Sequence, residues 1–138
     1  MTEINPELRA KIKNLTFSYL DRPQPELLIT VPNPHSDIDY IEELVYPEFT
    51  SLCPLARTQP DYATITIMYM PSEVICELKS LKFYLTSFRS VEIFHEAVVG
   101  QIYKDIVGKC NPKQIMVIGE FTVRGGIQTT VTVGSLTK

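Results

Sequence analysis

Cys53 lies in a loop bordered by prolines, eight residues before Asp61, within the stretch FTSLCPLARTQPDYATI at 49–65. A thiol that acts as a nucleophile needs a nearby group that takes its proton and returns a proton to the developing anion. Asp61 meets that need if the fold brings it close to Cys53. The alternatives are that Cys53 is a small buried apolar side chain and that Asp61 caps a turn or the start of a strand.

The other two cysteines, Cys76 and Cys110, stand in different settings. Three cysteines without a CxxC pair favour reduced thiols over a disulfide framework. Cys110 follows a predicted helix, and we interpret it as structural. Cys76 directly precedes a charged motif, so the sequence leaves both a structural and a functional role open for it.

That motif, ELKSLKFY at 77–84, combines an acidic residue with two lysines. Glu77 is predicted at a helix N-terminal end, and Lys79 and Lys82 share one face of the helix because they are three residues apart. Two cations beside a helix N-terminus can bind phosphate groups, whereas the alternative is a solvated lysine face. Arg124, in the stretch RGG, adds a third cation at a hairpin tip or is an ordinary surface residue of a tight turn.

A further polar pair, His95 and Glu96, is predicted at the start of the second helix. A glutamate at this position often only complements the helix dipole, and the histidine can be an ordinary surface residue. Alternatively, the carboxylate accepts two hydrogen bonds from the edge of a guanine-like base, and the histidine transfers protons near neutral pH.

The elements that must position these residues follow from hydrophobic periodicity. We expect strands over 26–33 and 62–70, separated by a long connection with a helical turn and a proline-rich loop. Two helical stripes follow, Leu78–Phe88 and Phe94–Ile106, the second ending before Gly108. Two more strands, 114–123 and 127–134, are joined by RGG, whose glycines permit positive φ. The order β-β-α-α-β-β predicts an α+β domain, an antiparallel four-stranded sheet with two helices on one face.

Composition narrows the class of protein. The chain has 138 residues, 44% of them hydrophobic, which suits one core; we expect an N-terminal arm over 1–24 and a single domain over 25–138. The formal net charge of −3 argues against a basic nucleic-acid groove. No segment reaches the roughly 18 apolar residues of a membrane span, and the first residues lack a secretory apolar stretch. We therefore expect a cytoplasmic protein that contacts neither nucleic acid nor membrane directly.

The motifs FTSLCP, PDYATI, ELKSLKFY, FHE and RGGI, in this order, resemble the QueF family of NADPH-dependent 7-cyano-7-deazaguanine reductases. The resemblance spans about 25–127 and implies the tunnelling fold (T-fold), whose subunits close into a ring. For the short, single-module branch it implies a homo-oligomer, a decamer of two pentamers with sites at subunit interfaces. It also implies reduction of the nitrile of 7-cyano-7-deazaguanine to 7-aminomethyl-7-deazaguanine, in the biosynthesis of the tRNA modification queuosine.

The resemblance further implies roles for individual residues. Cys53 attacks the nitrile carbon to form a covalent thioimidate, and Asp61 donates and accepts protons. The implied substrate contacts are Cys76, Glu77, Leu78, His95 and Glu96. The implied NADPH contacts are Leu78, Lys79, Arg124 and Gly125, with Lys82 as a further phosphate partner; no metal is expected.

Two features depart from the family pattern, and two other functions stay open. The Cys53–Asp61 separation is one residue longer than is usual in the family, and the tail after Ile127 lacks the usual acidic, proline-containing continuation. One alternative is a zinc-dependent, GTP cyclohydrolase-like pterin enzyme of the same fold. The only histidines, His35 and His95, have no cysteine at a ligand-like spacing. The other alternative is a non-catalytic purine-binding module.

Overall fold

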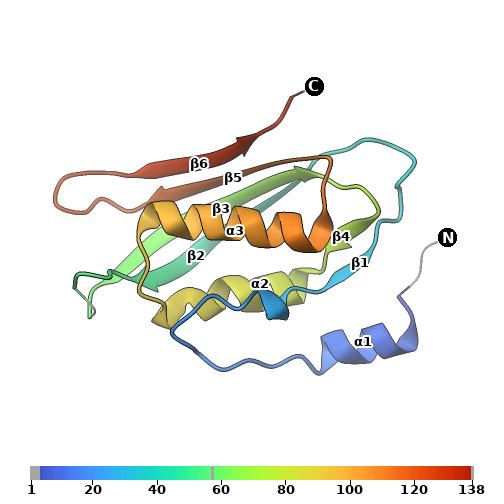
Figure 1. The fold of residues 1–138 in the computed structure, drawn as a ribbon, viewed down its shortest axis with the longest axis horizontal. Helices are drawn as coiled ribbons and strands as arrows, with labels where there is room; N and C mark the ends of the chain where they lie inside the picture. The colour runs from blue at the N-terminus through green and yellow to red at the C-terminus, as the bar shows by residue number, and fades with distance from the viewer. Residues whose placement is uncertain (1–3, 57, 138) are drawn as a thin grey trace.

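A four-stranded antiparallel sheet in the order β2-β3-β5-β6 forms the centre of the computed structural model, which describes residues 4–56 and 58–137. Its strands are β2 (Glu42–Leu52), β3 (Pro60–Met70), β5 (Gln114–Phe121) and β6 (Thr130–Ser135). Two helices, α2 (Leu78–Thr86) and α3 (His95–Cys110), lie side by side on one face of this sheet (Figure 1). The predicted α+β class is confirmed, and the strands of this sheet with their two helices follow the predicted order β-β-α-α-β-β.

Smaller elements flank this core. Strands β1 (Thr30–Pro32) and β4 (Val74–Cys76) pair as a separate two-stranded sheet. A 3-10 turn, Pro25–Leu27, precedes β1, and another, Ser87–Ser90, continues the chain from α2. Helix α1 (Pro6–Lys13) stands apart from the sheet, near the N-terminus (Figure 1).

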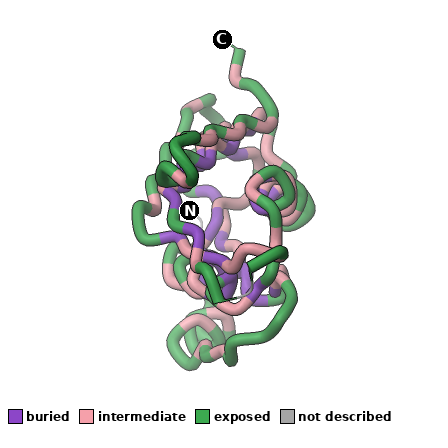
Figure 2. Tube along the Cα trace, turned by 90° about the vertical axis from the view of Figure 1, so that its left-hand side faces the viewer, coloured by how far each residue is buried: buried purple, intermediate pink, exposed green. Residues whose placement is uncertain are grey.

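The hydrophobic core lies between the sheet and the two helices, where Figure 2 shows the buried residues concentrated. From the sheet come Ile65, Ile67 and Val117, each fully buried on the face that alternation turns toward the helices. From α3 come Val98 and Ile102, also fully buried, at the i, i+4 spacing of a helical stripe. The two periodicities that identified these elements in the sequence thus meet in one core.

Strand β2 corrects the sequence-based prediction for the long connection. The segment expected to hold a helical turn is an 11-residue strand, Glu42–Leu52, paired with β3. Pro47 interrupts the alternation of exposed and buried residues that would identify the strand. The pairing register shifts beside it, between Tyr46 and Phe49. Proline is tolerated there because β2 lies at the sheet edge, where a bulge and a missing N–H donor cost little.

The predicted first strand, 26–33, is correct only over Thr30–Pro32, and it belongs to the smaller sheet. The predicted end of the second helix is also wrong. Helix α3 continues through Gly108 to Cys110, and its C-cap is Asn111, whose φ of 44° is left-handed, directly before Pro112. The last strand begins at Thr130 and not at Ile127.

The N-terminal arm contains one short helix, α1. Helix α1 buries none of its eight residues, and the Asn5 side chain caps it by accepting a hydrogen bond from the N–H of Leu8. The following segment reaches the core, where Leu15 and Phe17 pack against buried residues. The domain boundary between residues 24 and 25 stays a prediction. In the part of the chain that the structure describes, no helix is both long and apolar enough for a membrane span.

Candidate active site

Strand pairing brings Cys53 and Asp61 to the same end of the sheet. Strands β2 and β3 are antiparallel, with Leu52 opposite Pro60 and Ser51 opposite Asp61. The pairing continues into the loop, because the N–H of Cys53 donates to the carbonyl of Gln59 at 3.0 Å. The longer loop therefore leaves both residues facing one cavity of about 250 Å³, lined by Cys53, Pro54, Asp61, Phe94, His95, Glu96 and Arg124.

Asp61 is buried, and a side-chain nitrogen lies beside each of its carboxylate oxygens. Arg124 Nη2 forms an ion pair with Oδ1, and His95 Nε2 lies 3.3 Å from Oδ2. The same Arg124 nitrogen donates to the carbonyl of Pro60 at 2.8 Å. These contacts fix the carboxylate at the base of the cavity. The cluster also shows that Arg124, expected at a hairpin tip, turns back onto the sheet.

The first turn of α3 places His95 and Glu96 beside this carboxylate. The chain enters α3 along the end of β2, where the N–H of Leu52 donates to Val91 and the N–H of Ile93 donates to Leu52. The His95 ring stacks on Phe121, with centroids 3.9 Å apart and planes 8° apart. This stack orients the imidazole toward Asp61. Glu96 is exposed at the mouth of the cavity.

The stretch RGG forms the tight turn that the sequence predicted, and this turn positions Arg124. Arg124 and Ile127 exchange two backbone hydrogen bonds, of 2.8 and 3.0 Å. The two residues between them, Gly125 and Gly126, have φ of +59° and +81°, a region in which a side chain is strained. Most side chains at these positions would therefore strain the turn that aims the guanidinium at Asp61.

The second group of predicted site residues lies around the start of α2. The Glu77 carboxylate is the N-cap of this helix, accepting from the N–H of Lys79 at 2.9 Å and of Ser80 at 2.7 Å. The Lys79 ammonium donates to the carbonyls of Ile12 and Lys13 at the end of α1. Both side chains therefore have structural partners in a single copy of the chain.

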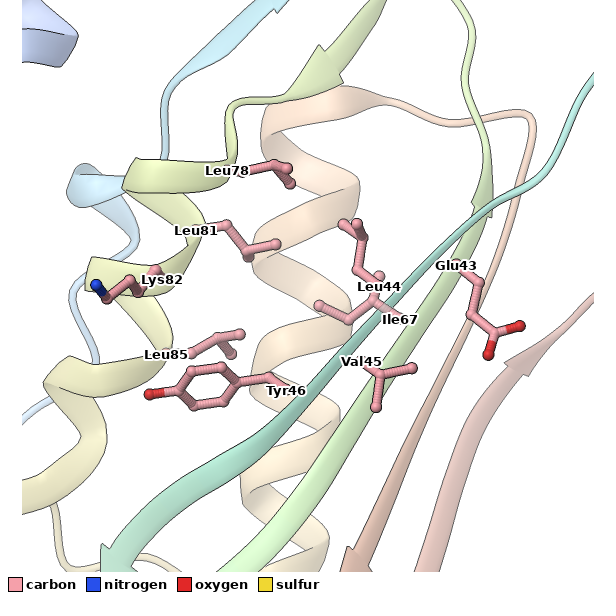
Figure 3. Close-up of a pocket in the computed structure, with 9 residues that line it drawn as sticks. All are labelled: Glu43, Leu44, Val45, Tyr46, Ile67, Leu78, Leu81, Lys82 and Leu85. Atoms are coloured by element: carbon pink, nitrogen blue, oxygen red, sulfur yellow. The ribbon is translucent and has the colours of Figure 1, made fainter.

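Leu78 and Lys82 line a different hollow, between α2 and β2 (Figure 3). Its volume is about 260 Å³. In Figure 3 the leucines of α2 point toward Leu44 and Ile67, whereas Lys82 points away from the strands. Leu78 and Lys82 are exposed, so both are accessible to a ligand.

Cys76 is buried and faces another thiol. Its Sγ lies 2.9 Å from the Sγ of Cys110, and its N–H donates to the hydroxyl of Tyr69 at 3.0 Å. The contact with Cys110, together with burial, raises the pKa of the Cys76 thiol well above its ordinary value. The structural interpretation of Cys110 fits this contact, and Cys76 presents its backbone, not its thiol, near the α2 motif.

The structure thus divides the predicted residues into two groups. Cys53, Asp61, His95, Glu96 and Arg124 meet at the end of the sheet where α3 begins, with Gly125 in the adjoining turn. The residues of 76–82 gather near β4, at the opposite end of the molecule (Figure 1). Sequence reasoning missed Phe121 as the support of His95, because a phenylalanine in an alternating strand reads only as core.

No group of three or more His, Cys, Asp or Glu side chains placed to hold a metal ion is found within residues 4–56 and 58–137. The cations available for an anionic cofactor are Arg124 in the cavity and Lys79 and Lys82 on α2. Of these, Lys82 is the most open to solvent, while Arg124 and Lys79 are engaged by Asp61 and by α1. Such cations suit the phosphate groups of a dinucleotide.

The antiparallel sheet, the paired helices and the thiol–carboxylate cavity define a protein of the T-fold class with a candidate catalytic cysteine. A solved structure, the archaeosine synthase QueF-Like in its apo form, shares this fold with a TM-score of 0.63; the match covers 69% of this chain and 92% of that one, at 21% identity. The family described as QueF-like protein matches residues 60–138. The chain belongs to this family.

Curated relatives agree over most of the chain. A protein of Chloroherpeton thalassium named NADPH-dependent 7-cyano-7-deazaguanine reductase is 48% identical over 109 residues, which is 79% of this chain and 93% of the relative. A protein of the same name from Neisseria gonorrhoeae is 47% identical over 129 residues, covering 92% of this chain and 82% of the relative.

Proposed function

We propose that this chain is an NADPH-dependent reductase that converts the nitrile of 7-cyano-7-deazaguanine to an aminomethyl group, in the cytoplasm, within queuosine biosynthesis. One observation carries the proposal: Cys53 and Asp61 line the same cavity as His95 and Glu96. A nucleophile, a proton carrier and a base-binding carboxylate are then available to one ligand. The names of the curated relatives support the same substrate and cofactor.

Cys53 is the nucleophile in this proposal. Its sulfur forms a bond to the nitrile carbon, one π bond of the C≡N group opens, and the electron pair moves to nitrogen. Asp61 accepts the thiol proton and delivers it to that nitrogen, so the product is a neutral thioimidate. The carboxylate can serve both steps because the strand pairing places it beside the Cys53 loop.

His95 and Glu96 hold the substrate. The exposed Glu96 carboxylate accepts hydrogen bonds from the N–H and amino groups of the guanine-like edge. His95, fixed by the Phe121 stack and by Asp61, offers a second proton-transfer group close to the reacting carbon.

The cations described above would hold the cofactor. Two molecules of NADPH, when bound in turn, supply the hydrides that reduce the carbon. Lys82 and Lys79 would contact phosphate groups, Arg124 would add a third cation, and the exposed Leu78 would cover the dinucleotide. Because Arg124 is paired with Asp61, cofactor binding must compete with that ion pair.

We further propose that a neighbouring copy completes the site, as in a ring of subunits, with a decamer of two pentamers as the specific assembly. The separation of the two residue groups in one chain supports this, because Cys76, Glu77 and Leu78 do not line the cavity of Cys53. The sheet also has two edge strands, β2 and β6, and among the described strands neither has a partner on its outer side. Pairing between copies would satisfy their backbone groups.

The test follows NADPH oxidation with 7-cyano-7-deazaguanine, together with intact-mass analysis for a covalent adduct. We expect two NADPH to be oxidised per nitrile, and both turnover and adduct to be lost in Cys53→Ala. Cys110→Ala is the matched control: it removes a thiol outside the cavity, so it should cost stability but retain the adduct. A folded native chain that neither oxidises NADPH nor forms an adduct would overturn the proposal.

A further inference from the structure

Ser51 has a buried hydroxyl group without a hydrogen-bond partner. The residue has no exposed surface, and among the described residues no donor or acceptor pairs with its Oγ. A buried polar atom without a partner disfavours the folded state, whereas alanine would fill nearly the same space without that penalty. Native proteins keep few such groups, and those that persist are often at functional or strained sites.

The position of Ser51 points to the partner that it lacks. Ser51 lies directly opposite Asp61 in the β2–β3 pairing, and opposite residues have Cβ atoms about 4.5–5.5 Å apart on the same face. Cys53 shares that face but is two residues along the strand, or about 6.6 Å away. The Asp61 carboxylate is therefore the group that a Ser51 hydroxyl reaches first.

Asp61 does not need Ser51 in the arrangement seen here. Its oxygens are held by Arg124 and His95. If the proposed function is correct, Arg124 also binds the anionic cofactor, whose phosphate groups then compete with Asp61 for the guanidinium. When Arg124 leaves, Oδ1 of the buried Asp61 needs another donor.

We propose that Ser51 is a positioning residue for Asp61, and that its hydroxyl pairs with the carboxylate whenever Arg124 is drawn away. A hydroxyl suits this task because it can donate to an ionised carboxylate and accept from a protonated one. A guanidinium can only donate. Ser51 would thus hold Asp61 in place through both halves of a proton transfer, which Arg124 cannot do.

A thermal-unfolding cycle tests the proposal without requiring turnover. The variants are Ser51→Ala, Arg124→Ala and the double variant, compared at one fixed protein concentration. With Arg124 present, Ser51→Ala removes no hydrogen bond, so Tm should stay the same or rise slightly. In the Arg124→Ala background, Ser51 is the substitute partner of Asp61. There, Ser51→Ala should lower Tm by a further amount of about 3–5 °C.

Ser87→Ala is the matched control. Ser87 is also fully buried, but its hydroxyl donates to the carbonyl of Tyr84 at 2.6 Å. This variant should lower Tm equally in both backgrounds, because it belongs to no shared network with Arg124. An equal effect of Ser51→Ala in both backgrounds, or a fall in Tm with Arg124 intact, would overturn the proposal.

Kinetics then tests the use of Ser51 in the reaction. Ser51→Ala should reduce kcat roughly tenfold, less than the loss of Asp61 itself, with the KM for the nucleobase unchanged. Ser87→Ala should retain the native kcat. A native kcat in Ser51→Ala would show that turnover does not use the hydroxyl. If the native chain does not reduce the nitrile at all, the proposed function fails, and the unfolding cycle still decides the role of Ser51.

Discussion

Gly119 is a position where one added methyl group should damage both the core and the site. It is a buried residue of β5, next to Val99 of α3. A Cβ atom there would come within 2.6 Å of Val99 Cγ2 and 2.9 Å of Phe121 Cε1. Val99 is one turn after His95 on α3, and Phe121 carries the His95 ring. Gly119→Ala therefore pushes on both supports of His95.

Two opposing effects set the change in the free energy of unfolding that Gly119→Ala causes. Forcing a methyl group into a packed core costs about 1–3 kcal/mol, because buried Val99 and Phe121 have no open space to move into. Replacing glycine by alanine also reduces the conformational entropy of the unfolded chain, which stabilises the folded state by about 0.4–1 kcal/mol. We expect a net loss of about 1–2 kcal/mol in the free energy of unfolding, which lowers Tm by roughly 3–10 °C.

Urea and thermal unfolding at one protein concentration measure this loss. Gly108→Ala is the control, because it is an exposed position in α3 with no atom within 4 Å of the added Cβ. There the same change should stabilise the chain by about 0.5–1 kcal/mol, since alanine favours a helix. We also expect Gly119→Ala to lower kcat, as His95 shifts from Phe121. A Gly119→Ala variant as stable as the native chain would refute the packing argument.

The remaining predictions concern the two residue groups. Glu96→Ala should raise the KM for the nucleobase more than that for NADPH; equal changes would remove it from base recognition. Lys82→Ala should raise the KM for NADPH without lowering Tm, because the side chain is exposed, and an unchanged KM would exclude it from the cofactor site. Iodoacetamide should label Cys53 first in the folded chain. Cys76 should stay unlabelled until the chain unfolds, because its raised pKa keeps that thiol protonated and unreactive at neutral pH. Mass analysis of the labelled peptides measures which cysteine reacts first. Chelators should leave activity intact, and loss of activity restored by zinc would revive the pterin alternative.

Local pattern in the sequence was sufficient for much of the fold. Strand β3 alternates, α2 and α3 carry apolar stripes, and RGG forms a turn with positive φ at both glycines. Each signal lies within one element, where the backbone period decides which side chains are buried. The motif residues could likewise be identified by type, and Glu77 caps α2 as its position indicated.

Strand β2 shows where local pattern fails. Pro47 interrupts its alternation, so the segment reads as a loop, and it is a strand because β3 supplies its partners over nearly its whole length. Pairing with a neighbour outweighs the weak preference of the segment itself. The same pairing sets Ser51 opposite Asp61, a relation that no spacing along the chain reveals.

The sequence by itself determined which residues could do chemistry and most of the helices and strands that carry them. Only the tertiary structure decided that Arg124 folds back onto Asp61, that Phe121 supports His95, and that Lys79 binds the end of α1. The physical reason is that periodicity fixes which face of an element is buried, whereas the meeting of two side chains distant in sequence depends on strand register and on packing between layers.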